Sequence, residues 1–545
     1  MTHPGDRRKF QLHLKKGGIL HLPRKRPPKK QPNKIHYIKK GNIMKRTIAL
    51  LLVLLMAGGS LLSCSEATSD ETTDTASAPT ADGEAAVEET VDPNARLDSG
   101  LGTADYEGYN FNIFVHNTIY NDWNAEEVTG EPINDAKYER MTTVSDNANV
   151  TITPVIVTAD NRAGHTPLSN SVQAGTNDYD LVELSAYSAC NALVAGLLRD
   201  MNAIENLDLS REWWDQYANE DFRFKDSIYM ATGDISLADN NATYCIYFNK
   251  RIATDYNIPN LYEMVDNMTW TIDNYRAFAE AYGADTDNDG NHVNDPDDEY
   301  GVYIWDDIMM GIVNASGIKC CTINQETGAI ELSLFSEKFV DAFNKFTLYA
   351  YNKDTTCAYQ RNGYAADYGA IAFKEGRALF FMVNLGAAIG LREMDDDFGI
   401  LPLPLYDENQ DRYYNSIASW AGAFYSIPRN SYGDEGFSRA GYLTQALAYE
   451  SKYTLTPAYY DQTLKGKTSR DEESSAMLDL IFATRTYDFG WYFEIGGYNE
   501  GIMNLLRNYS SDVTSMYEKS SKAANKVLSK YNENIKELMA MEQGG

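Results

Sequence analysis

Histidine and cysteine are scarce in this chain, which limits the metal and redox chemistry that it can carry. The 545 residues include seven His and six Cys. After residue 64 only His116, His165 and His292 remain, far apart in the sequence, and no group of His and Cys has the spacing of a zinc site. Five cysteines follow Cys64, so at least one has no partner within the chain, and small buried thiols are the simplest expectation.

Common hydrolase motifs are missing as well. The sequence contains no Gly-x-Ser-x-Gly elbow and no His-Glu-x-x-His pattern. A glycoside hydrolase needs two carboxylates at a defined separation, and 78 acidic residues supply many pairs, so composition leaves that class open. Because no hydrolase motif is present, we nevertheless predict that the protein is not an enzyme.

The chain has no apolar run suited to a permanent membrane span near its start. The run Ile48–Ala57 has ten residues, whereas a bilayer core needs about twenty. Met44-Lys45-Arg46 precedes it, and small residues and Leu61-Leu62-Ser63-Cys64 follow, the order of a bacterial lipoprotein signal. We predict a signal peptide at 44–63 and acylation of Cys64, which places the protein on the extracytoplasmic face of the cell membrane. An ordinary cleaved signal with an incidental cysteine is the alternative.

Basic residues are few after the signal. Residues 1–63 hold 15 of the 48 Lys and Arg and one of the 78 Asp and Glu, which leaves a formal charge of −44 from Cys64 onward. Such a surface repels nucleic acid and anionic lipid. Because a signal peptide should open its chain, we interpret residues 1–43 as an upstream over-prediction of the start, with Met44 as the true start. Nucleic-acid binding by their basic run is the alternative.

Periodicity predicts a tether followed by a mixed fold. Residues 64–104 are rich in Ser, Thr, Ala and acidic residues and cannot bury a core, so we expect a flexible tether. Strand and helix patterns then alternate, which predicts an α/β fold with a parallel-rich sheet, and the length predicts more than one lobe. The predicted strands cover 111–115, 151–157, 180–184, 244–248 and 378–383, and the predicted helices cover 135–148, 271–282, 440–450 and 509–541.

Four short motifs stand in an order typical of one bacterial receptor family. Tyr179–Leu184 followed by Gly196–Met201 is similar to its strand, cleft loop and G-L-L stretch, and Tyr247–Lys250 is similar to its Y-Y-N-K strand end. Phe373–Asn384 resembles F-x-x-G-x-A-A-M, and Phe398–Pro404 resembles G-x-x-P-x-P. Nearly the whole mature chain thus resembles extracellular solute-binding proteins of ABC sugar importers (family 1), the cluster that includes maltodextrin-binding proteins.

The resemblance implies two α/β lobes with a ligand cleft between them. Closure would trap a carbohydrate, with an oligosaccharide expected, and present a surface to the permease subunits in the membrane. It also implies a monomer that requires no cofactor and binds no nucleic acid. The implied boundaries are 105–238 with 409–457 for lobe 1, 243–398 with 458–545 for lobe 2, and hinges near 238–243 and 399–408.

Sugars are held by aromatic faces that stack on the ring and by planar polar groups that bind the hydroxyls. This chain departs from the family's pattern at Leu385-Gly386, where Gly-Pro is usual, and the departure blurs which side chain beside Asn384 faces the ligand. For each aromatic the alternative is packing, and for the Asn pair it is turn chemistry. By matching position, the resemblance implies ligand contacts from Tyr187, Asp239, Asn240, Asn241, Trp305, Asn384, Trp420, Trp491 and Tyr492.

An acidic loop carries the sharpest short motif. Asp285, Asp287 and Asp289 occupy positions one, three and five of an EF-hand-like pattern, with Gly at six and Asn291 at seven. Position twelve is Pro296 instead of the bidentate Glu. The pattern suggests a structural calcium site, and a plain solvated turn is the alternative.

Two other functions compete with the receptor hypothesis. A surface-anchored glycoside hydrolase would turn over the sugar that it binds. A structural or adhesive lipoprotein would need neither a hinge nor a cleft. Neither class has a motif of its own in this chain.

Overall fold

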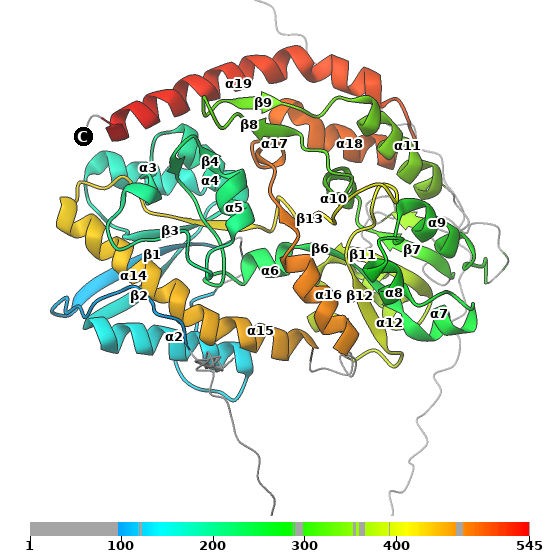
Figure 1. Cartoon of the computed structure of the whole chain (residues 1–545), viewed down its shortest axis with the longest axis horizontal. Coiled ribbons are helices and arrows are strands. Elements are labelled where there is room, and N and C mark those ends of the chain that lie inside the picture. The colour runs from blue at the N-terminus through cyan, green and yellow to red at the C-terminus, as the bar shows by residue number, and fades with distance from the viewer. Residues whose placement is uncertain are drawn as a thin grey trace, which may run out of the picture. The chain divides into compact units, whose positions relative to one another are not determined.

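The computed structural model describes residues 96–117, 119, 122–286, 288, 298–351, 356–358, 366–391, 393–464 and 472–543 (Figure 1). All of them belong to one compact unit, Val91–Gly545. Residues 1–63, the anchor Cys64 and most of the tether therefore lie outside the described residues. No described helix is long and apolar enough to span a membrane.

The first sheet has four strands in the order β14-β3-β1-β2. Strands β1 (Tyr109–His116), β2 (Val150–Val157) and β3 (Leu181–Ser185) run parallel, and β14 (Ala423–Ser426) joins antiparallel to β3. Every residue of β3 is buried, as expected for a central parallel strand, including Glu183, whose carboxylate accepts from Trp123 and Tyr425 at 2.9 Å. Helix α2 (Pro132–Ala148) has a proline at its first position, where no backbone N–H is needed. Asn149 follows its last residue in the left-handed conformation and caps it.

The second sheet has five strands in the order β10-β7-β11-β6-β12. They are β6 (Tyr244–Asn249), β7 (Tyr300–Ile304), β10 (Thr356–Ala358), β11 (Ala378–Asn384) and β12 (Phe398–Leu401). Strands β10, β7 and β11 are parallel, and β6 is antiparallel to both β11 and β12. Strands β6 and β11 are buried along their whole length, so this sheet is covered on both faces.

The remaining elements cover the two sheets and connect them (Figure 1). They are α3 (His165–Ala174), α4 (Ala186–Val194), η1 (Met201–Ala203), α5 (Gln216–Asp221), β4 (Arg223–Phe224), β5 (Ser227–Ile228), α6 (Ala238–Ala242), α7 (Lys250–Asp255), α8 (Leu261–Asp266), α9 (Ile272–Glu280), α10 (Ile308–Ala315), β8 (Cys321–Ile323), β9 (Ile330–Leu332), α11 (Glu337–Ala350), α12 (Ala366–Lys374), η3 (Leu385–Ala387), α13 (Ala388–Leu391), β13 (Asn415–Ser416), α14 (Asp434–Tyr453), α15 (Leu455–Leu464), α16 (Glu472–Phe482), β15 (Arg485–Thr486), α17 (Phe489–Tyr492), η4 (Ile495–Gly497), α18 (Tyr498–Arg507) and α19 (Val513–Gln543).

The chain passes between the sheets close to α6. Strand β13 pairs parallel with β15, and Thr243 bridges to Ile417 beside them. The Leu405 amide donates to the carbonyl of Trp270, just before α9, at 2.9 Å, so the chain is still held beside the second sheet at this point. The hinges near 238–243 and 399–408 stay predictions.

The start of the described chain is fastened to α14 by tyrosines. Tyr453 Oη accepts from the Leu97 amide at 2.7 Å, and Tyr449 Oη donates to the Leu97 carbonyl at 2.9 Å. Arg96 forms an ion pair with Glu450 at 2.9 Å. Helix α14 in turn packs its buried leucines into the core of the first sheet. The first described residues are therefore held through the first sheet.

Candidate functional site

Two tryptophans from different sheets lie ring against ring. Trp305 follows β7 and Trp420 precedes β14, and their ring centroids are 4.9 Å apart at an interplanar angle of 32°. Trp420 keeps 36% of its surface exposed, high for so large an apolar side chain. The pair marks a place where the two sheets meet and an aromatic face is accessible.

Two cavities of about 340 and 380 Å³ adjoin this pair and share Asn384 and Gly386. Trp305 lines the first, and Trp420 and Asn241 line the second. Each volume is within the ~300–1,000 Å³ typical of small-molecule sites. Four of the predicted ligand residues, Asn241, Trp305, Asn384 and Trp420, are therefore brought together.

The close fit of η3 against α6 shapes this site. A Cβ on Gly386 would lie 3.2 Å from the Asn241 carbonyl oxygen, so a larger residue would push the two segments apart. Asn241 Oδ1 is buried, and no described residue donates a hydrogen bond to it. The site thus combines an apolar lining with amide groups that can bind hydroxyls.

A buried carboxylate beneath the tryptophans was missed by the sequence analysis. Asp307 is 4% exposed, and Tyr244 Oη donates to its Oδ2 at 2.9 Å. Burial raises the pKa of Asp307 to about 7, and the charge of Asp306 adds to this against the hydrogen bonds from Tyr244 and Trp420. The signal was present, since two carboxylates directly follow Trp305 at a strand end.

Tyr187 is buried, does not line either cavity, and is held by contacts from two other segments. Its Oη is 3.0 Å from Ser419 Oγ, and the Arg162 guanidinium lies 4.5 Å from the centre of its ring. Arg162 also donates to both Glu494 carboxylate oxygens at 2.6 and 2.7 Å. Glu494 precedes η4, so this bidentate pair links the loop before α3 to the segment that packs against α18 and α19.

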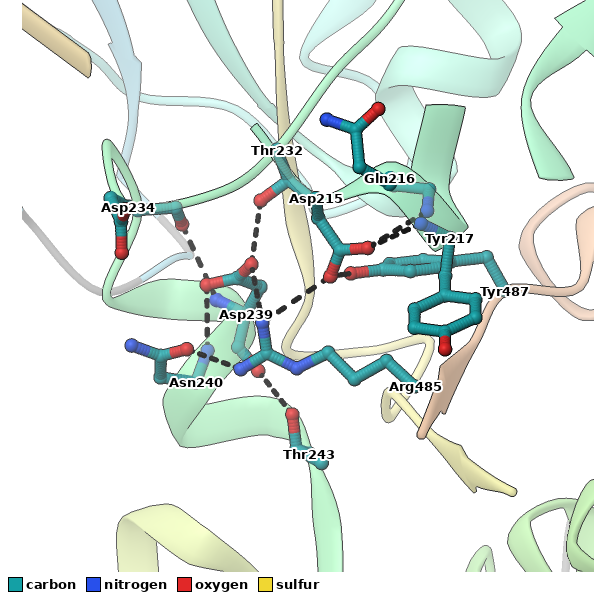
Figure 2. Close-up of polar contacts among 12 residues, drawn as sticks. Asp215, Gln216, Tyr217, Thr232, Asp234, Asp239, Asn240, Thr243, Arg485 and Tyr487 are labelled. Atoms are coloured by element: carbon teal, nitrogen blue, oxygen red, sulfur yellow. Dashed lines mark hydrogen bonds and ion pairs between the residues drawn. The ribbon is translucent and has the colours of Figure 1, made fainter. Parts of the chain in front are cut away.

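Asp239 and Asn240 lie in a different network, drawn in Figure 2, where Asp215 and Asp239 point toward the Arg485 guanidinium. Arg485 lies 3.4 Å from the Asp239 carboxylate and 3.5 Å from that of Asp215, and it donates to Asn240 Oδ1. Asp239 has no exposed surface, and Thr232 Oγ1 donates to it at 2.7 Å. Burial raises its pKa to about 6, although Arg485 opposes the shift.

This network joins the segments that cross between the sheets. Asp239 belongs to α6 and Arg485 to β15, while Tyr487 Oη donates to Asp215 at 2.7 Å. Asp239 is therefore held by the contacts of this network, and it does not line the two cavities. Asn240 lines a separate cavity of about 320 Å³ on another face of α6.

Trp491 and Tyr492 are buried in the main core. Each is 2% exposed, and Trp491 Nε1 donates to Asn314 Oδ1 at 2.9 Å. The Tyr492 ring lies 5.3 Å from that of Phe424. Their burial fits packing in the core, the alternative to a ligand contact, because neither ring has an exposed face.

The acidic loop is described only at its ends. Asp287, Asp289 and Asn291 lie outside the described residues. Asp285 stands where Ala284 bridges to Glu299, and the Thr286 amide donates to Asp298 at 2.7 Å. Among the described residues no group of three or more His, Cys, Asp or Glu is placed to hold a metal ion. The calcium site stays a proposal.

Solved structures with the same fold are bacterial solute receptors. The chain resembles an ABC substrate-binding protein from Listeria monocytogenes in complex with cycloalternan, at TM-score 0.50 and 11% identity, over 77% of this chain and 99% of that one. It resembles UgpB from Mycobacterium tuberculosis in complex with glycerophosphocholine, at 0.51 and 17%, over 77% and 98%. A cyclo/maltodextrin-binding protein complexed with maltotetraose matches at 0.50 and 15%, over 79% and 98%. The chain has the two-lobed α/β fold of ABC solute-binding proteins.

This finding confirms the predicted fold class. At such identities the likeness concerns the fold and leaves function to the site itself. No protein-family model matches the sequence, and no curated protein matches it significantly.

Proposed function

We propose that this chain is an extracytoplasmic receptor that captures a carbohydrate between its two lobes and delivers it to an ABC permease. The observation that carries the proposal is the Trp305–Trp420 pair beside the two cavities that contain Asn241 and Asn384. Aromatic faces suit the apolar face of a sugar ring, and amides suit its hydroxyls. The known structures that share the fold hold sugars or a phosphodiester, which fits a small polar solute.

The remaining parts of the proposal concern how the receptor is held. Cys64 carries the lipid, the tether gives reach, and the lobes are 105–238 with 409–457 and 243–398 with 458–545. The Arg162–Glu494 pair and the tryptophan pair each join a residue of one proposed lobe to a residue of the other, so each favours an arrangement in which the lobes are closed.

A glycoside hydrolase is less well supported by the site. Among the described residues that line the two cavities none is acidic, whereas that chemistry needs two carboxylates flanking the scissile bond. Asp307 lies beneath the tryptophans as a single buried carboxylate.

The test is to screen purified chain against an oligosaccharide panel by thermal shift and to titrate the hits by calorimetry. A bound sugar raises the melting temperature by mass action and is recovered unchanged. Cleavage of the sugar would overturn the receptor role in favour of the hydrolase. No shift with any glycan would overturn the carbohydrate assignment.

A further inference from the structure

Helix α19 presents a line of four lysines to solvent. Lys519, Lys522, Lys526 and Lys530 are spaced by three, four and four residues, which places them on one face of the helix. We call them the lysine stripe. All four are exposed, and they extend over about 16 Å at the ~1.5 Å rise per residue of a helix.

The stripe faces directly away from the body of the molecule. The buried side of α19 consists of Ala524, Leu528, Ile535 and Leu538, which are at most 4% exposed. Lys522 is two residues from Ala524, and Lys526 and Lys530 are two residues from Leu528, so each lies about 200° around the helix from a packed residue. Figure 1 shows α19 running along the edge of the described unit.

No stripe lysine forms an ion pair with a described residue. Like charges three and four residues apart destabilise a helix, and the stripe has three such steps. Opposite charges at helical spacing are fewer, with Glu518 four residues before Lys522 and Glu533 three residues after Lys530. The stripe ends at Glu533, one turn beyond Lys530. The chain as a whole carries a formal charge of −30, so this local positive charge departs from the general composition.

The surroundings of the stripe indicate what it could bind. A protein partner usually needs an apolar or aromatic centre to its interface, and between Lys519 and Lys530 the one large exposed apolar side chain is Val527, at 37%. A headgroup layer needs no such centre, because mobile anionic lipids attract lysines as point charges. Glu518 and Glu533 lie within about 10 Å of the ends of the stripe and offset part of the attraction there, whereas more distant acidic groups are screened at physiological salt.

We propose that the lysine stripe docks the folded unit on the anionic phospholipid headgroups of a membrane. Composition alone argues for repulsion from anionic lipid, whereas the segment of α19 from Lys519 to Lys530 presents four exposed lysines with no acidic residue between them. The proposal is independent of the ligand cleft, so its failure leaves the receptor role untouched.

The experiment uses residues 91–545, because this unit contains all described cores and excludes the basic and apolar residues before Cys64. Sedimentation with phosphatidylcholine vesicles that contain about 30% phosphatidylglycerol, compared with pure phosphatidylcholine, measures binding. We expect binding to the anionic vesicles alone, and its loss at about 0.5 M salt.

Variants assign the effect to the stripe. Lys522→Gln with Lys526→Gln should weaken binding about 25-fold, since each lysine near an anionic surface contributes about fivefold. Lys522→Arg with Lys526→Arg should retain it. The matched control, Lys374→Gln with Lys452→Gln, removes the same charge from α12 and α14 and should leave binding unchanged. Circular dichroism confirms that each variant is folded.

Three results would overturn the proposal. Anionic vesicles fail to bind the folded unit, or the control variant loses binding as much as the stripe variant. In the third, sedimentation velocity shows lysine-dependent self-association without vesicles, which would make the partner an acidic protein surface on a second copy.

Discussion

At the residue scale, Trp420 is the side chain on which the proposed binding site most depends. It is the exposed member of the tryptophan pair, and it lines the second cavity. Trp420→Ala should lower sugar affinity about 10- to 100-fold, because the ring supplies the stacking face that a hydroxyl-rich ligand needs. Calorimetric titration measures the loss. Tyr256→Ala removes a 47%-exposed aromatic outside the cleft and should leave affinity unchanged. Equal affinity in both variants would place the sugar elsewhere.

A second prediction concerns Asp307 and the pH dependence of the stability of the fold. Its pKa is about 7 in the folded chain and near 3.8 when it is not perturbed. Between these values the folded state holds a proton that the unfolded state has lost, so the contribution of Asp307 to stability falls as pH rises from about 4 to about 7. Asp307→Asn should be stabilising relative to the natural chain above pH 7, and this advantage should vanish near pH 4. Urea unfolding across this range measures the difference. An advantage that does not change with pH would mean that Asp307 is ionised in the folded chain throughout.

At the element scale, the Arg485 network holds the crossing segments together. Arg485→Met leaves Asp215 and Asp239 buried without their cation, so unfolding at neutral pH should become easier by about 3–5 kcal/mol. Arg211→Met breaks an exposed pair with Asp208 and should cost less than about 1 kcal/mol. Chemical denaturation compares the two. A similar small loss in both variants would show that the buried carboxylates are neutralised without Arg485.

Sequence reasoning worked best for elements whose pattern is local. The helix predicted over 271–282 corresponds to α9, at whose start the Thr271 hydroxyl accepts from the Asn274 amide. The strand predicted over 180–184 corresponds to β3, whose short run of Leu181, Val182 and Leu184 is a local signal. Pairing between distant segments leaves no local trace, so the parallel pair of β13 and β15 and the hydrogen bond from Arg485 to Asn240 were not foreseen. For the same reason the aromatic character of Trp491 and Trp420 could not show that one packs in the core and the other faces the cleft.

At the scale of the whole molecule, the Arg162–Glu494 pair should influence how open the lobes are. Its side chains are 53% and 31% exposed, so its contribution is at most about 1 kcal/mol. Glu494→Gln should therefore raise the radius of gyration without ligand and weaken sugar binding by no more than about fivefold. Small-angle scattering and titration measure the two effects. Asp255→Asn, which breaks an exposed pair with Arg251, serves as the control and should change neither. An unchanged radius in the Glu494 variant would mean that other contacts alone hold the lobes closed.

The tyrosines that fasten residues 96–102 to α14 bear on the proposed lipid anchor, because a force on the tether would reach the fold through them. Tyr442 adds a third bond, to the Gly102 carbonyl at 2.8 Å. In the proposed lipid-anchored receptor, a pull on the tether would enter α14 and, through its packed leucines, the first sheet. The second of the two proposed lobes would then carry no load, and it could close on the first while the tether is stretched.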